Sequence, residues 1–145
     1  MKKILTIALL IAMCSVTVYA RGKKPITYKQ LPKPVQKEFK KSFPDDEVQL
    51  VTSERIINKH YKYTLMTADD TKVIYNEKGV VLSVENEQGI KETFLPKPVL
   101  TYLKKTFPNA TVTYYERATS KQVVDLNNKM KVVFTRGGRF LRLED

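Results

Sequence analysis

The chain contains very few of the residues that carry most enzyme chemistry. Its 145 residues include one cysteine, Cys14, and one histidine, His60. His60 follows Asn58 and Lys59 in a polar turn with no other metal ligand beside it, which predicts a solvated loop histidine rather than a metal site. We therefore expect no metal and no cofactor, and the single cysteine limits any thiolate chemistry to position 14.

The first 20 residues have the pattern of a secretory signal peptide. Met1–Lys3 is a positive start, residues 4–16 are apolar, and Val18-Tyr19-Ala20 is typical of a cleavage site. Two alternatives are an uncleaved membrane anchor, for which the apolar run is short, and a lipoprotein anchored through Cys14, where the preceding Met13 is bulky. Cleavage after Ala20 predicts an exported protein, periplasmic or extracellular, with no stable membrane span.

The predicted mature chain of 125 residues is basic and lacks cysteine. Removal of Lys2 and Lys3 leaves 24 basic and 15 acidic residues, a net charge of +9. Without disulfides, an exported protein depends on its core alone for stability. The charge predicts contact with an anionic envelope component or an acidic protein, while no motif indicates binding of nucleic acid.

The remaining polar clusters predict turns rather than active sites. Asp45-Asp46-Glu47 lacks the spaced oxygen ligands and the glycine of a calcium loop. Asp69-Asp70 is a hairpin turn for the same reason. Gly137-Gly138 precedes a predicted strand, whereas a phosphate loop precedes a helix. A hydrolase would need two convergent carboxylates, and no pair is placed to converge, so we expect no enzyme.

The chain contains one motif set twice. Leu31-Pro-Lys-Pro-Val35 recurs at residues 95–99, and Lys40-Lys-Ser-Phe-Pro44 recurs with one change at residues 104–108. Between residues 31 and 48, 10 of 18 positions are identical to the residue 64 places later. The repetition predicts two copies of one small unit. The domain prediction is a signal peptide at 1–20, a first repeat with a basic, flexible leader at 21–86, and a second repeat at 87–145.

Each copy is predicted to be a helix followed by strands. Leu31, Val35, Phe39 and Phe43 recur every four residues and share one helical face, and Pro44 ends the helix. After each Phe-Pro the apolar period becomes two, with hairpin turns between the segments. The predicted fold class is α+β: two tandem repeats, each one helix and a four-stranded antiparallel meander, with the helices on one face of the sheet. The side chains expected to face the helices are Val48, Leu50, Tyr63, Leu65, Val73, Tyr75, Leu82 and Val84, and Val112, Tyr114, Val124, Leu126, Val132, Phe134, Leu141 and Leu143.

These repeated motifs resemble the PepSY-like family, and more narrowly its small exported proteins described as β-lactamase-inhibitor-like. The resemblance covers residues 26–144 and rests on structural positions: Leu31/Leu95, Pro32/Pro96, Phe43/Phe107, Pro44/Pro108 and Gly79/Gly138. It implies a two-repeat exported fold with an open sheet surface that binds something. It supplies no catalytic residues, and fold alone does not confer inhibition of a hydrolase.

The sheet face away from the helices is the preferred candidate site. In the second copy this face is predicted to place aromatic and apolar side chains among bases, as protein-binding surfaces do. The candidate partner-binding residues are Tyr115, Arg117, Val123, Lys131, Val133, Phe140 and Arg142. We expect a non-enzymatic binding protein that engages a protein partner there, as an inhibitor or accessory factor. Two other readings are that the chain covers this face with its own elements, or that the β-branched residues lie there because they favour strands.

The alternative function uses the outer faces of the helices. Lysines gather on both of them: Lys33, Lys37, Lys40, Lys41, Lys97, Lys104 and Lys105. Such a surface is suited to anionic lipid or polysaccharide, although a lysine-rich helix face is also typical of a solvated surface that keeps a protein soluble.

Overall fold

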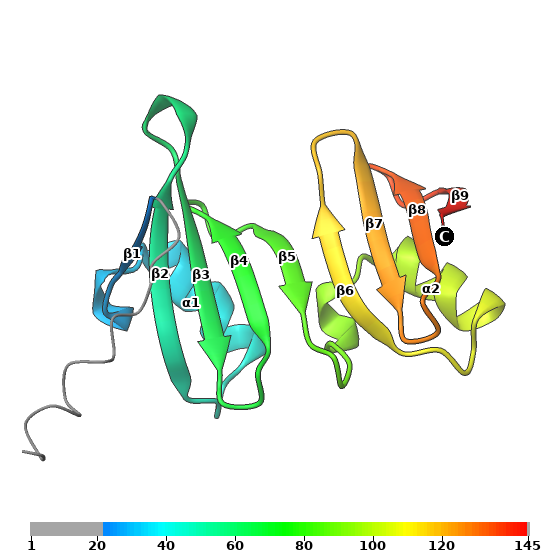
Figure 1. Ribbon diagram of the computed structural model, residues 1–145, viewed down its shortest axis with the longest axis horizontal. Coiled ribbons are helices and arrows are strands. Elements are labelled where there is room, and N and C mark those ends of the chain that lie inside the picture. The colour runs from blue at the N-terminus through cyan, green and yellow to red at the C-terminus, as the bar shows by residue number, and fades with distance from the viewer. Residues whose placement is uncertain (1–21, 145) are drawn as a thin grey trace, which may run out of the picture.

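A single antiparallel sheet runs through the whole of the computed structural model, which describes residues 22–144 (Figure 1). The predicted signal peptide lies outside the described residues. The strands pair in sequence order and are β1 (Lys23–Pro25), β2 (Val48–Arg55), β3 (Tyr61–Thr67), β4 (Lys72–Asn76), β5 (Val81–Glu85), β6 (Val112–Arg117), β7 (Lys121–Leu126), β8 (Lys131–Thr135) and β9 (Phe140–Glu144). The α+β class is therefore confirmed, with nine strands and two α-helices among residues 22–144.

The helices begin and end where the prolines predict. α1 spans Lys33–Ser42 and α2 spans Lys97–Thr106, and each has a proline at its N-cap and another in its first turn. A first-turn proline loses nothing, because its missing N–H would have no partner inside the helix. At the other end, the Phe43 N–H still donates to the Phe39 carbonyl oxygen at 2.8 Å, and Phe107 does the same to Leu103 at 2.7 Å. Pro44 and Pro108 then prevent continuation.

Each helix covers the same face of the sheet and closes one apolar core. Val35 and Phe39 of α1 pack with Leu65, Val73 and Tyr75, all of which are buried. α2 does the same with Val99 and Leu103 against a second buried group: Tyr115, Val124, Leu126, Val132 and Phe134. The lysines predicted on the outer helix faces are all exposed.

The prediction of which strand residues face the helices is wrong at the β-bulges. Gln49 and Thr113 are extra residues on β2 and β6, and Leu82 and Leu141 are extra on β5 and β9. Because an extra residue reverses the alternation of side chains beyond it, Val51 and Tyr115 enter the cores in place of Leu50 and Tyr114. Leu50 and Leu141 are 43% and 45% exposed. Leu143 lies opposite the core residue Val132, on the predicted face, but is also 45% exposed on the last strand.

The leader differs from expectation, and the sequence did not predict how the sheets of the two repeats join. Lys23–Pro25 is not a flexible leader but forms β1, which pairs with residues 52–54 of β2 and adds a strand to the eight that were predicted. The two repeats do not form separate sheets. β5 pairs with β6 through Ser83–Glu85 and Tyr114–Glu116, so one sheet continues across the junction.

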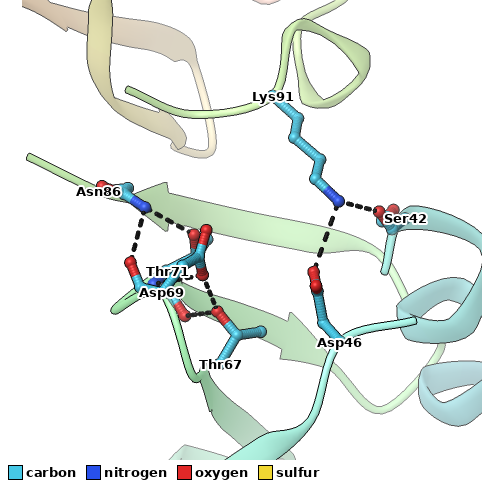
Figure 2. A network of polar contacts seen from close by, with 7 residues as sticks. All are labelled: Ser42, Asp46, Thr67, Asp69, Thr71, Asn86 and Lys91. Atoms are coloured by element: carbon cyan, nitrogen blue, oxygen red, sulfur yellow. Dashed lines mark hydrogen bonds and ion pairs between the residues drawn. The ribbon is translucent and has the colours of Figure 1, made fainter. Parts of the chain in front are cut away.

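A polar network stabilises this junction (Figure 2). The buried Asn86 amide donates to the Asp69 carbonyl oxygen at 3.1 Å and to Thr71 Oγ1 at 2.8 Å. The Thr67 hydroxyl donates to the Asp69 carboxylate and lowers the pKa of that group. These bonds satisfy polar groups where the chain leaves the first repeat, which makes the turn costly to rearrange.

The segment that leads into α2 belongs partly to the first core. The short 3-10 turn η4 (Glu92–Phe94) places the Phe94 ring 5.4 Å from that of Phe43, centroid to centroid. Lys91 lies over the same Phe43 ring at 4.4 Å and donates to the Ser42 carbonyl oxygen at 2.8 Å (Figure 2). The second repeat therefore completes the core of the first.

Candidate functional site

The sheet face opposite the helices is open. Figure 1 looks onto this face, with α1 and α2 behind the sheet. Within residues 22–144, no helix or strand packs over it. The helices and strands of the described residues thus leave this face uncovered, although neighbouring side chains bury Val123 and Val133 on it. The junction between the two repeats lies in the middle of this face, and the candidate site lies at the junction.

A groove of about 720 Å³ occupies the open face where the two repeats meet. Its lining comes from both copies, and volumes of this size are typical of ligand sites in proteins. β5 and β6 pair over only three residues each, so the strands separate beyond Ser83 and Glu116. The walls come from the β2–β3 connection, the β4–β5 turn and the β6–β7 connection.

The floor of the groove is apolar because two bulges change the direction of side chains. Ile74 lies opposite Ser83 in the register, and Ser83 lies opposite Glu116. Leu82 is the extra residue of the β5 bulge and joins this floor. The same effect on β6 brings Tyr114 to the open face. Ile74, Leu82 and Tyr114 thus form an apolar strip shared by both repeats.

Charged and polar groups form the rim. His60 Nδ1 lies 2.9 Å from Glu77 Oε1, which joins the β2–β3 connection to the β4–β5 turn. Across the groove the Tyr114 hydroxyl donates to Glu116 at 3.2 Å. Burial, reinforced by Glu116, raises the pKa of Tyr114 to about 12, so the phenol keeps its proton at neutral pH. Lys62, Lys78 and Arg117 add positive charge to the rim.

Two of the predicted partner-binding residues belong to the core. Tyr115 is 2% exposed and its hydroxyl donates to Gln122 Oε1 at 2.8 Å. Phe140 stacks on Tyr102 of α2 with ring centroids 4.9 Å apart. Their placement on the open face was wrong, because the bulges at Thr113 and Leu141 turn both side chains toward the helix.

The other five predicted residues divide between the groove and the rest of the open face. Arg117 lines the groove. Val123 and Val133 lie opposite each other and are buried, flanked in the register by Glu116 and Arg142. Lys131 and Arg142 lie beyond them, and Arg142 pairs with Glu144. The predicted set does not come together as one site, and its role in binding a partner stays a prediction.

The buried position of Tyr115 predicts a stability effect for its hydroxyl. Tyr115→Phe leaves the buried Gln122 Oε1 without its donor and should lower the free energy of unfolding by about 1–2 kcal/mol. Tyr114→Phe, the neighbouring change on the open face, should cost clearly less because water reaches that site. Urea unfolding of the two variants measures the difference. Equal losses would show that Tyr115 is not the core residue described here.

Sequence reasoning missed most of the groove. Tyr114 and Leu82 were assigned to the helix side, and His60 was predicted as an isolated loop residue. The signal that could have placed Leu82 and Tyr114 is a pair of adjacent apolar residues in each strand, Val81-Leu82 and Tyr114-Tyr115, which breaks a strict alternation. His60 and Glu77 lie in two different connections, and no local pattern specifies that their side chains meet.

The groove lining combines apolar, polar and charged side chains. Its groups can donate or accept hydrogen bonds, form ion pairs and cover apolar surface. Among residues 22–144, no group of three or more His, Cys, Asp or Glu side chains is arranged to hold a metal ion. In the same part of the chain no helix has the length and apolar character needed to cross a membrane.

Comparison with solved structures shows that the fold recurs. Two similar structures are of Bacteroides vulgatus proteins that are provisionally described as periplasmic, the first of them as of unknown function. They are 24% and 23% identical to this chain and cover 86% and 88% of it. Both are covered completely, with TM-scores of 0.78 and 0.79. A Bacteroides thetaiotaomicron protein, provisionally described as calcium-regulated and periplasmic, is 23% identical over 85% of this chain and 97% of its own, with a TM-score of 0.78.

Comparison with protein families gives the assignment. No curated protein matches the chain. The model of the family described as beta-lactamase-inhibitor-like, PepSY-like matches twice, over residues 18–83 and 62–142, in agreement with two tandem repeats. The chain therefore belongs to the PepSY-like family of beta-lactamase-inhibitor-like proteins.

Proposed function

We propose that this protein is an exported, non-enzymatic binding protein whose groove engages a segment of a protein partner. The observation that carries the proposal is the apolar strip of Ile74, Leu82 and Tyr114 at the bottom of an open groove. An apolar centre with aromatic character inside a polar rim is the arrangement that protein-binding surfaces favour.

The chemistry of the rim favours a polypeptide as the occupant. Bases (Lys62, Lys78 and Arg117) and carboxylates (Glu77 and Glu116) both line the groove around the apolar floor. A peptide segment presents apolar side chains together with backbone donors and acceptors. It can therefore cover the apolar floor and form hydrogen bonds with the polar rim at the same time. A rim of mixed charge sets orientation and specificity more than affinity.

Two observations support export. The first 20 residues follow the secretory pattern, and the Bacteroides proteins of the same fold are described as periplasmic. We do not extend calcium regulation to this chain, because its acidic turns supply no convergent set of ligands among the described residues. The role of inhibitor or accessory factor follows from the family description and belongs to this proposal.

The proposal is tested by site-specific photocrosslinking in cells that export the protein. A photoreactive phenylalanine at Leu82, on the groove floor, should give a discrete adduct whose added mass is protein. The matched control is the same probe at Leu141, the extra residue of the equivalent bulge in the second repeat, which is 45% exposed away from the groove. No adduct is expected there.

A second variant makes the result specific. Tyr114→Ala removes the central aromatic side chain of the floor and should lower the adduct yield at Leu82 about tenfold or more, as expected for a central anchor. A far-ultraviolet circular dichroism spectrum and urea midpoint close to those of the unmodified protein confirm folding. Adducts of equal yield at Leu82 and Leu141, or adducts only to lipid, contradict the proposal.

A further inference from the structure

The β2–β3 connection exposes apolar surface at the most prominent point of the sheet. This hairpin extends beyond the neighbouring β4–β5 turn (Figure 1). Ile57 at its tip is 84% exposed and Ile56 is 37% exposed. Single exposed apolar residues are common, so the exposed tip alone does not indicate a binding surface. Here the shape of the hairpin and the charges around it indicate one.

The hairpin tip is held in one shape. The Ile56 N–H donates to the His60 carbonyl oxygen at 2.8 Å and closes the loop. Asn58 and Lys59 then adopt left-handed backbone conformations, with φ of 63° and 64°. Two successive residues of this kind form the tight turns typical of β-hairpins. Ile57 is therefore presented outward by a defined turn.

The strand order brings four connections to this same end of the sheet. In an antiparallel meander, the β2–β3, β4–β5, β6–β7 and β8–β9 connections all lie at one end. Together with the one strand residue on either side, these segments contain one acid, Glu77, and seven bases: Arg55, Lys59, Lys78, Arg117, Lys121, Arg136 and Arg139. Glu54, Lys62 and Glu116 lie one residue further into the strands. We call this surface the basic end.

The turns at the opposite end of the sheet contain more acids. Asp45, Asp46, Glu47, Asp69, Asp70, Glu87 and Glu92 lie in the connections at that end, together with Lys91 and Lys129. Two of these connections also contain the short turn before α1 and the helices α1 and α2, which carry further lysines: Lys29, Lys33, Lys37, Lys40, Lys41, Lys97, Lys104 and Lys105. The basic end therefore differs from the opposite end in having almost no acids in its turns, which suits it to a negatively charged plane.

We propose that the basic end docks on an anionic lipid bilayer and that Ile57 enters the interface between headgroups and acyl chains. The bases span the width of the sheet, which matches an extended negative plane better than a compact partner. Tyr61, 38% exposed beside the tip, is an aromatic residue of the kind that favours the interface. Apolar insertion and several cations acting together are what bind peripheral proteins reversibly.

The absence of tryptophan makes a direct test available. In Ile57→Trp, the one tryptophan should shift its emission to the blue with vesicles of phosphatidylglycerol and phosphatidylethanolamine, and brominated acyl chains should quench it. Phosphatidylcholine vesicles should cause no shift. The control is Leu50→Trp, at a site 43% exposed near the opposite end of β2, which should remain unshifted. A shift at both sites or at neither overturns the proposal.

Vesicle cosedimentation of the exported protein separates the contribution of apolar insertion from that of electrostatic attraction. Ile57→Ser should weaken partitioning roughly tenfold, about the value of burying one such side chain, whereas Leu50→Ser should not change it. Lys59→Gln should weaken it about fivefold, and raised salt should weaken all variants. If Lys37→Gln and Lys41→Gln on α1 abolish binding while Ile57→Ser leaves it intact, the lipid surface is the helix face and this proposal is wrong.

Discussion

Phe43→Ala is expected to lower the free energy of unfolding by about 3–5 kcal/mol, the usual range for removing a fully buried aromatic side chain. Phe43 is 1% exposed and its ring stacks on Phe39 at 5.0 Å. It also contacts Phe94 and Lys91, which come from the second repeat. The substitution therefore opens a cavity in the first core and weakens the attachment between repeats. Thermal and urea unfolding measure the loss.

The duplication supplies a matched control for this prediction. Phe107 has the same place after α2 that Phe43 has after α1, but it is only partly buried against the second core. Among the described residues no aromatic ring stacks on it. Phe107→Ala should cost less than half as much as Phe43→Ala. Similar costs for both changes would contradict the view that Phe94 and Lys91 complete the first core.

Gly79→Ala is expected to destabilise the protein by about 2–4 kcal/mol, through backbone strain and a collision together. Gly79 has a φ of +79°, a region in which side chains other than hydrogen are rare. An added Cβ would also lie 2.7 Å from the carbonyl oxygen of Pro34 in α1. Because that neighbour is helix backbone, it cannot turn aside. The β4–β5 turn or the helix must move.

Gly137→Ala is the control for Gly79→Ala. Gly137 also lies in a hairpin turn, but its φ is outside the left-handed region and the nearest atom to an added Cβ is Thr135 Oγ1 at 3.9 Å. Its substitution should change stability by less than about 0.5 kcal/mol. Denaturant midpoints for both variants give the comparison, and a Gly79→Ala midpoint equal to that of the unmodified protein would show that the turn adapts freely.

Much of the fold was predictable because its signals are local. The repeated prolines predicted both helices, and the four-residue apolar period correctly predicted Val35 and Phe39 as buried. The bulges were not predicted, because an alternating pattern specifies which residues share a face only while the register is unbroken. Leu50 next to Val51 is compatible with either phase. The partner strand and the helix above it decide between them.

The candidate site was harder to predict than the fold because it is a product of the junction. Each repeat alone predicts an open sheet face, but the groove exists only where β5 meets β6. Ile74 and Tyr114 lie forty residues apart in the chain, and no spacing rule relates them. The candidate partner-binding residues predicted in the second copy were wrongly placed at Tyr115 and Phe140. The reason is the same as for the core prediction, because bulges reverse the alternation of side chains there.

The contact of Phe94 with Phe43 makes the two ends of the tandem repeat different. At the place in the first repeat that corresponds to Phe94 the chain has Gln30, and Lys91 corresponds to Thr27, so the leading edge of the array is polar. The trailing edge still presents Phe107 without an aromatic neighbour. An engineered third copy with its own Lys-x-x-Phe lead should therefore join after residue 144, extending the ribbon from that side alone.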